Sequence, residues 1–280
     1  MMESSQLGDY MLEVKNLEYT YESGKKVLDG LSLSTNNGAI TMIIGENGAG
    51  KTTLFKNILG LLKKDKGEIV VDGEELRYDK KSLLNYRKNV TMVFQDPDNQ
   101  IFYSNVFDDT AFTLRNLGFD EDTVKERVDK ALRSANAYEL KDMPVHFLSY
   151  GQKKRVAIAS AIALGANYIL MDEPTAGLDP VSIGILKKTI AGIAKDSSLL
   201  ISTHDMEFCY EMADYIYVVK DAKIIKEGTK YEIFKDEDVI KRANQELPMC
   251  VRVANALGVD FFDNNDQMIE ELKNYAKHSS

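Results

Sequence analysis

The sequence predicts an α/β fold with a mainly parallel sheet, and three observations carry that prediction. Short apolar runs at 39–44, 90–94, 168–171 and 199–202 have the length and composition of buried strands. Each run is followed at its carboxyl end by either a glycine-rich loop or a polar residue, and this is the edge at which open parallel sheets bind ligands. Between the second and third runs the spacing becomes helical, so helices are expected to be inserted between the strands.

Two strand-like segments precede the first of these runs. Residues 12–21 alternate between apolar and polar side chains, and residues 27–33 resemble the next strand. We expect both to form an antiparallel sheet at the edge of the fold. Tyr21 closes the first segment, and its ring either stacks on an adenine base or is an ordinary surface tyrosine.

The most specific motif is the loop at residues 45–53. Its pattern is glycine, four residues, then Gly50, Lys51 and Thr52, which is the spacing of a phosphate-binding P-loop. Lys51 is expected to reach the β- and γ-phosphates of a nucleotide, and the Thr52 hydroxyl to ligate Mg²⁺. Backbone N–H groups of the loop face the phosphates. The residues assigned to nucleotide binding here are Gly45, Asn47, Gly48, Ala49, Gly50, Lys51, Thr52 and Thr53.

Polar residues at the other strand ends complete a site for ATP hydrolysis. Asp172 follows an apolar strand, where a carboxylate holds the magnesium of a bound nucleotide. Glu173 is placed to orient or deprotonate the attacking water. His204 is expected to bind the γ-phosphate or steady that water, and Gln95 to touch both magnesium and water. The predicted catalytic residues are Glu173, His204 and Gln95, and the predicted magnesium ligands are Thr52, Gln95 and Asp172.

Two regions have helical periodicity. Val124, Val128, Leu132 and Ala135 recur at intervals of four or three residues, with Asp120 or Asp122 as the N-cap, within an inserted helical subdomain at about 96–165. The sequence is helical again from about residue 236. An apolar face there must pack on this chain or on a partner, and it comprises Met268, Ile269, Leu272, Tyr275 and Ala276.

Composition excludes several classes of protein. The 280 residues include 35 Lys and Arg against 44 Asp and Glu, and the net charge of −9 argues against a general nucleic-acid binder. Cys209 and Cys250 match no metal or disulfide spacing, which is typical of a reducing cytosol. No apolar run approaches bilayer-spanning length and the N-terminus lacks a secretion signal, so the chain is not expected to cross a membrane alone.

With these motifs in order, the chain resembles the ATP-binding subunits of ABC transporters. Residues 148–152, Leu-Ser-Tyr-Gly-Gln, are similar to the signature motif of that family, 45–53 to its Walker A, 168–173 to its Walker B, and 176–179 to its D-loop. His204 is similar to its switch histidine. The resemblance covers roughly residues 12–234, and it implies an ATPase domain at 10–235 and a helical C-terminal extension at 236–280.

The resemblance also implies a head-to-tail dimer that sandwiches two ATP molecules. Ser149, Gly151 and Gln152 would face the γ-phosphate held by the partner's P-loop, and Asp179 would join the nucleotide-binding set. Tyr150 departs from the usual second glycine of the motif, which puts the packing of that loop in question.

A narrower resemblance links residues 93–112 and the tail at 237–280 to energy-coupling-factor importers of cobalt, nickel or vitamins. It implies a second ABC ATPase subunit, a transmembrane coupling protein docking near the segment after Gln95, and a membrane protein that captures the substrate. The chain would then lie at the cytoplasmic face of the membrane, where the C-terminal tail would help to hold the dimer. Cobalt or another transition metal ion is the expected cargo, and a vitamin the alternative.

Two other functions compete with transport. Non-transport ABC ATPases that act on DNA or ribosomes usually carry coiled-coil arms or two cassettes, whereas this chain has one P-loop and no sustained heptads. A P-loop kinase acting on a small molecule would leave residues 148–152 without a purpose.

Overall fold

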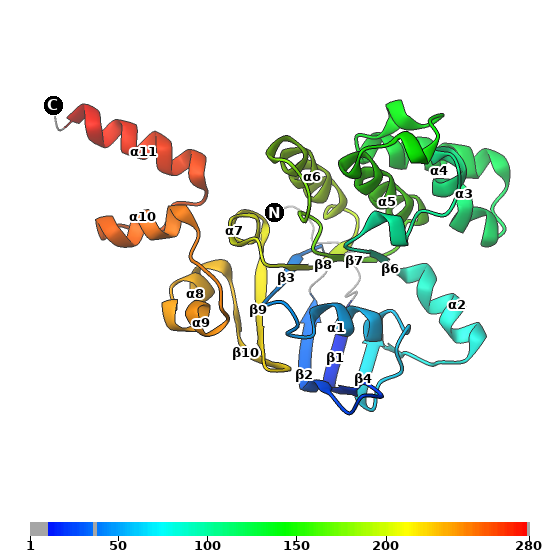
Figure 1. Ribbon diagram of the computed structural model, residues 1–280, viewed down its shortest axis with the longest axis horizontal. Coiled ribbons are helices and arrows are strands. Elements are labelled where there is room, and N and C mark those ends of the chain that lie inside the picture. Colours follow the sequence, from blue (N-terminus) through cyan, green and yellow to red (C-terminus); the bar gives the residue numbers. More distant parts are fainter. Residues whose placement is uncertain (1–10, 36–37, 279–280) are drawn as a thin grey trace, which may run out of the picture.

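The computed structural model describes residues 11–35 and 38–278, and its strands form two sheets (Figure 1). The strands are β1 (Leu12–Thr20), β2 (Lys26–Thr35), β3 (Ile40–Ile44), β4 (Lys66–Val71), β5 (Glu74–Glu75), β6 (Val90–Val93), β7 (Tyr168–Asp172), β8 (Ser198–Thr203), β9 (Tyr215–Lys220) and β10 (Lys223–Gly228). The α-helices are α1 (Lys51–Ile58), α2 (Lys80–Asn89), α3 (Val106–Asn116), α4 (Glu121–Ser134), α5 (Tyr150–Leu164), α6 (Pro180–Ile193), α7 (Met206–Met212), α8 (Lys230–Phe234), α9 (Glu237–Arg242), α10 (Met249–Leu257) and α11 (Asn265–His278).

The larger sheet has the order β10-β9-β3-β8-β7-β6 and is parallel except at β10, which confirms the predicted mainly parallel sheet. Every residue of β3, β7 and β8 is buried, because helices or the second sheet cover both faces. The register pairs Ile44 with Thr203 and Asp172 with Ser202. The carboxyl ends of the three central strands therefore lie side by side.

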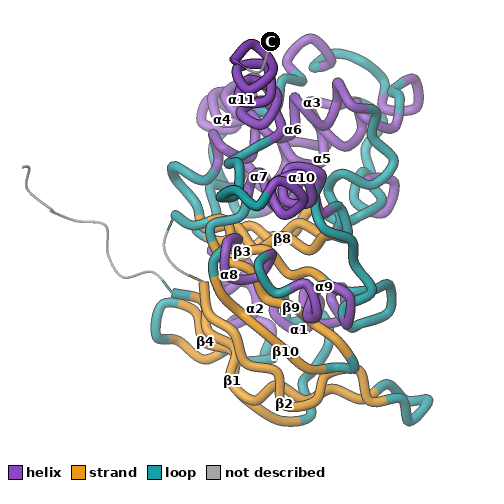
Figure 2. The backbone as a smooth tube through the Cα atoms, turned by 90° about the vertical axis from the view of Figure 1, so that its left-hand side faces the viewer, coloured by secondary structure: helices purple, strands orange, loops and turns teal. Residues whose placement is uncertain are grey.

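The second sheet, β2-β1-β4-β5, is antiparallel, as the edge sheet was predicted to be. Helix α1 lies between the two sheets (Figure 1), where Leu54, Phe55 and Ile58 are fully buried. One apolar cluster joins this helix to β1 and to the central strands. The P-loop helix is consequently fixed on two sides. Figure 2 shows the strands of this sheet below the main body of helices.

Helices α3, α4 and α5, with three short 3₁₀ turns, are inserted between β6 and β7, as predicted. Val124, Val128 and Leu132 are fully buried along α4. Of the two candidate caps, the structure selects Asp120, whose side chain accepts from Thr123 N at 2.9 Å. The described part of the chain contains no helix that has the length and apolar composition needed to cross a membrane.

The C-terminal helices α8–α11 follow β10; α8 and α9 pack beside β10 as part of the larger apolar core, and α10 and α11 lie further from the sheet (Figure 1). Met268 is buried and Leu272 packs against the same cluster, as expected. Ile269 is 45% exposed, so this chain does not cover that part of the face, and its packing on a partner stays a prediction. Consecutive helical residues point about 100° apart, so Ile269 faces away from the side that Met268 buries. The side chains of Tyr275 and Ala276 lie outside the described residues. The division at residues 235 and 236 remains a prediction.

Candidate active site

Two positions of the loop after β3, Gly45 and Gly50, have no room for a side chain. A Cβ on Gly45 would lie 2.3 Å from Val219 O, and a Cβ on Gly50 would lie 2.7 Å from Val27 O. Gly50, with φ of 105°, is also the N-cap of α1. Glycine therefore lets the loop pass close to the neighbouring strands and turn into the helix. This places the N-terminus of α1 at the end of β3, the arrangement that binds phosphate.

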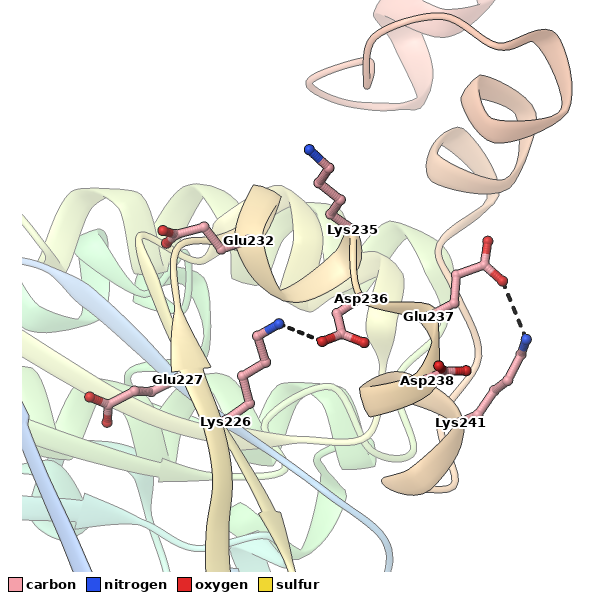
Figure 3. Close-up of a pocket in the computed structure, with 8 residues that line it drawn as sticks. All are labelled: Lys226, Glu227, Glu232, Lys235, Asp236, Glu237, Asp238 and Lys241. Atoms are coloured by element: carbon pink, nitrogen blue, oxygen red, sulfur yellow. Dashed lines mark hydrogen bonds and ion pairs between the residues drawn. The ribbon is translucent and has the colours of Figure 1, made fainter.

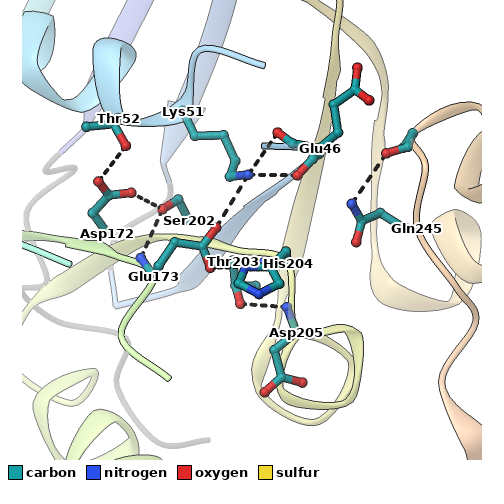
Figure 4. A network of polar contacts seen from close by, with 12 residues as sticks. Glu46, Lys51, Thr52, Asp172, Glu173, Ser202, Thr203, His204, Asp205 and Gln245 are labelled. Atoms are coloured by element: carbon teal, nitrogen blue, oxygen red, sulfur yellow. Dashed lines mark hydrogen bonds and ion pairs between the residues drawn. The ribbon is translucent and has the colours of Figure 1, made fainter. Parts of the chain in front are cut away.

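The ammonium group of Lys51 lies inside this loop. Its Nζ donates to Gly45 O at 2.7 Å and to Glu46 O at 3.3 Å, and lies 3.4 Å from Glu173 Oε1 (Figure 4). The Lys51 side chain is only 6% exposed, so its charge is little screened by water. A positive charge held at this place suits the β- and γ-phosphates of a nucleotide.

Asp172 joins the end of β7 to the P-loop. Its Oδ2 accepts from the Thr52 hydroxyl at 2.6 Å, and its Oδ1 accepts from the Ser202 hydroxyl at 2.5 Å (Figure 4). The Asp172 carboxylate is buried. A carboxylate and a hydroxyl are hard oxygen donors of the kind Mg²⁺ prefers, so this pair fits a magnesium ion. Ser202 was not predicted, because nothing marks one serine inside an apolar strand.

Glu173 and His204 form a second contact across the strand ends. Glu173 Oε2 accepts from the His204 backbone N at 3.1 Å and lies 2.7 Å from His204 Nδ1 (Figure 4). The other oxygen, Oε1, makes no hydrogen bond within the described residues, although it is buried. Glu173 has a φ of 45°, a left-handed conformation that costs energy for a residue with a side chain and is frequent at functional sites. The carboxylate is thus held through Oε2, while Oε1 makes no hydrogen bond in the part of the chain that the structure describes and has the Lys51 ammonium 3.4 Å away.

Gln95 enters the site from the loop after β6. Its exposed side chain borders the cavity, and its backbone O accepts hydrogen bonds from the Tyr150 hydroxyl at 3.0 Å and from Lys154 Nζ. The Lys154 side chain is 1% exposed, and burial lowers the pKa of its ammonium to about 8. Two side chains of α5 therefore hold the backbone of Gln95.

The predicted catalytic residues and magnesium ligands, except Asp172, which lies behind Thr52, line one open cavity of about 470 Å³. The cavity is lined by Tyr21, Lys25, Val27, Asn47, Gly48, Gly50, Lys51, Thr52, Thr53, Gln95, Glu173 and His204. The Tyr21 hydroxyl lies 2.9 Å from the Thr53 hydroxyl, which fixes the ring at the rim. The sequence reasoning missed Lys25 and Val27, because no motif marks the turn between β1 and β2. Gly45 and Ala49 belong to the same loop behind this lining.

Four predicted site residues lie elsewhere. Ser149 and Gln152 satisfy each other in a capping box at the start of α5, and Asp179 caps α6 through Val181 N at 2.9 Å. Gly151 faces Ser182 of α6. None of these four lines the cavity around Lys51. The structure thus separates the signature residues from the P-loop of the same chain.

A second hollow lies on the C-terminal side, near α8 and α9 (Figure 3). Half of its eight charged lining residues are in ion pairs, with Lys226 bound to Asp236 at 2.6 Å and Lys241 to Glu237 at 3.3 Å. The strand that borders it, β10, is antiparallel, so this hollow has neither a glycine-rich loop nor the end of a parallel strand. The cavity at the P-loop is therefore the better candidate for catalysis.

The fold and this set of side chains define a P-loop ATPase. A model of the ABC transporter family matches residues 28–176. The energy-coupling factor transporter ATP-binding protein EcfA of Methanocaldococcus jannaschii is 43% identical over 251 residues, covering 89% of each chain. The cobalt import ATP-binding protein CbiO of Salmonella paratyphi A is 38% identical over 270 residues, covering 95% of this chain and 98% of that protein.

Among solved structures, cbiO1 from Clostridium perfringens, part of the ABC transporter complex cbiONQ, matches with a TM-score of 0.76 and 37% identity. The match covers 90% of this chain and 100% of that one. The chain belongs to the family of ABC transporter ATP-binding proteins, which confirms the resemblance seen in its motifs. It is an enzyme that hydrolyses ATP, and its relatives include the energy-coupling-factor ATPases.

Proposed function

We propose that this chain powers a membrane importer of the energy-coupling-factor type, with cobalt or another transition metal ion as its cargo. Support for the cargo comes from a cobalt import ATP-binding protein that is 38% identical over 95% of this chain. The observation that carries the chemistry is the meeting of Lys51, Asp172 and Glu173 at the end of the central strands. A vitamin is the second candidate cargo, because importers of this type also serve vitamins.

The proposed reaction starts with ATP in the cavity. Its phosphates lie against the loop that begins at Gly45, beside the Lys51 ammonium, and its base lies near Tyr21. Thr52 and Asp172, with Gln95 from the facing loop, would hold the magnesium ion of the nucleotide, which would neutralise phosphate charge when bound. These groups fix the γ-phosphate for attack by water.

Hydrolysis then depends on Glu173. Its buried Oε1 makes no hydrogen bond within the described residues and has the Lys51 ammonium 3.4 Å away. It accepts a proton from the attacking water as the water oxygen bonds to the γ-phosphorus and the bond from that phosphorus to the ADP oxygen breaks. His204 positions the carboxylate by binding its other oxygen. Removing either contact on Oε2 would let the base rotate away from the water.

The assembly we propose contains a second ABC ATPase subunit, a transmembrane coupling protein and a substrate-capture membrane protein. Ser149 and Gly151 lie outside the cavity of their own chain, which supports their use in the site of a second subunit. The chain works at the cytoplasmic face of the membrane as a peripheral subunit, and nucleic acid has no part in its function.

Isolation from the native membrane tests this proposal. The tagged chain is extracted in mild detergent, with an untagged strain as the control, and the bound proteins and metals are identified by mass spectrometry. We expect two kinds of membrane protein, one of them carrying cobalt or another transition metal. A vitamin on the capture protein would favour the second cargo. Recovery of soluble or nucleic-acid partners alone would overturn the importer.

A further inference from the structure

Tyr150 stands where the resembled signature motif usually has a glycine, and it joins two segments of the nucleotide site. It is the first residue of α5, and its hydroxyl donates to Gln95 O at 3.0 Å. On the other side its ring lies against Gly177, where a Cβ would come within 2.8 Å of the ring carbon Cε1. A glycine at position 150 could make neither contact.

The contact with Gln95 is reinforced one turn further along α5. The buried Lys154 ammonium donates to the same Gln95 oxygen and lies 5.8 Å from the centroid of the Tyr150 ring. A carbonyl oxygen has two lone pairs, and two donors from one helix saturate both. The backbone of Gln95 is consequently attached to the first two turns of α5.

The three connected segments have different tasks. The Gln95 side chain borders the ATP cavity, and Gly177 lies in the loop between Glu173 and the N-cap Asp179. Helix α5 begins directly after Ser149. If the dimer of the proposed function forms, Ser149 serves the ATP held by the other subunit. A displacement of Gln95 by nucleotide in one site is then passed through Tyr150 to the residues of the other.

We propose that Tyr150 is a positioning residue that locks Gln95 and the Gly177 loop to the start of α5, and so couples ATP in one site to the signature residues of the next. This inference rests on the ATP-bound dimer of the proposed function. It assigns to Tyr150 a role in turnover and dimer closure and none in holding ATP within a single chain.

Three variants test the coupling. Tyr150→Phe keeps the ring against Gly177 and removes only the hydroxyl, Tyr150→Gly restores the usual residue and removes both contacts, and Tyr231→Phe is a matched control. Tyr231 is 43% exposed and its hydroxyl binds Asp263, away from the cavity. ATP hydrolysis is measured on the full chain in its membrane complex, and ATP binding and thermal unfolding on the isolated chain.

We expect Tyr150→Phe to lower kcat about three- to tenfold, the range that one hydrogen bond supports, without changing ATP binding or the unfolding temperature. Tyr150→Gly lowers kcat further, and Tyr231→Phe behaves as the wild type. Wild-type kcat in both Tyr150 variants would overturn the inference. If Tyr150→Gly unfolds, the Phe variant alone decides. A parallel loss of ATP binding and kcat would also overturn it, because a local packing defect would then suffice.

Dimer closure gives an independent readout. In the Glu173→Gln background, sedimentation measures how much ATP is needed to convert monomer to dimer. We expect Tyr150→Phe to raise that ATP concentration several-fold, and an unchanged value would count against the coupling. Absence of any ATP-dependent dimer while Tyr150 is intact, both with this chain alone and with the second ATPase subunit recovered from the membrane complex, would contradict the proposed assembly itself. The two failures are therefore distinguishable.

Discussion

Glu173 occupies the most constrained position in the site. Its left-handed backbone turns the side chain back across the strand ends, where His204 holds one oxygen and Lys51 lies 3.4 Å from the other. The cost of this conformation is met by the buried strands on both sides, which leave Glu173 little freedom. A carboxylate fixed in this way is suited to receive a proton from water.

Replacing Glu173 by Gln tests that assignment at the level of one atom. Gln has the same size and keeps an acceptor for His204, but an amide does not take up the proton. We expect kcat to fall by a factor on the order of 10² to 10⁴ while ATP binding is retained. Glu227→Gln, at an exposed position on β10, is the control and should hydrolyse ATP normally. Near-normal turnover in Glu173→Gln would remove Glu173 from its role.

Asp109, on α3 in the inserted helical subdomain, gives a pH-dependent prediction. Its buried Oδ1 accepts from Phe102 N at 2.8 Å and Tyr103 N at 3.0 Å, and burial raises the pKa of its carboxyl. Because the pKa is higher in the folded chain than in the unfolded one, this group stabilises the fold most at acidic pH. That stabilisation is lost as the pH rises through the folded-state pKa.

Asp109→Asn keeps an oxygen acceptor for both N–H groups and removes the buried charge. We expect the variant to have a higher free energy of unfolding than the wild type at pH 7, measured by urea denaturation. The difference should shrink as the pH falls toward 4. A variant that is less stable at pH 7, with a deficit that grows as the pH rises, would show that the ionised form is the stabilising one.

A single site residue could be predicted when the sequence immediately around it forms a recognisable motif. Lys51, Thr52 and Asp172 are marked by their distance from an apolar strand, and the structure brings them together. Ser202 and Lys25 have no local signal, because their places depend on strands and turns that meet only in the folded chain. Tyr150 and Gln95 are 55 residues apart in the sequence. The sequence therefore marked Tyr150 as unusual in its motif but did not indicate its contact with Gln95.

Among the elements, those with a regular apolar pattern were predictable. Strands β3, β7 and β8 read as continuous apolar runs because both faces are covered. Helix α2 was not predicted, since none of its residues is fully buried and its packing side is short, with Leu83 and Tyr86 against the neighbouring apolar cluster. Strand β10 was missed for a similar reason, because it is an edge strand with charged residues interspersed.

Helices α10 and α11 are tied to the body of the protein through α7. Glu207 lies three residues after His204, and its Oε1 accepts from Met249 N at 2.6 Å while its Oε2 accepts from Asn265 Nδ2 at 3.0 Å. Pro248, the N-cap of α10, provides no side-chain cap. Glu207 therefore replaces the missing cap from another element.

Glu207→Ala should loosen both helices without unfolding the rest. We expect amide hydrogen exchange in α10 and α11 to become about tenfold faster, because hydrogen bonds to a charged group are lost. Amides of the buried face of α4 provide the internal control and should keep their rates. Unchanged exchange in α10 would show that apolar packing alone holds these helices, and equal acceleration in α4 would point to global destabilisation.

At the scale of the whole molecule, the C-terminal part of the chain contacts two places. It contacts α7, and it also contacts the P-loop. Asn244, in the turn after α9, donates to the carboxylate of Glu46 inside the P-loop, and Lys220 lies 3.8 Å from the same group. The tail thus contacts the loop that binds phosphate. The predicted use of this tail in holding two subunits together remains a prediction.

The measurement that tests the central claim most directly is ATP-dependent uptake of cobalt by vesicles carrying the complex isolated from the native membrane. The wild type and Glu173→Gln are compared with equal amounts of protein and with ATP on the side of this chain. We predict cobalt accumulation that requires ATP and is lost in Glu173→Gln. Equal accumulation with both proteins would contradict the account, and so would ATP hydrolysis by the wild type with no uptake of cobalt, of another transition metal ion or of a vitamin.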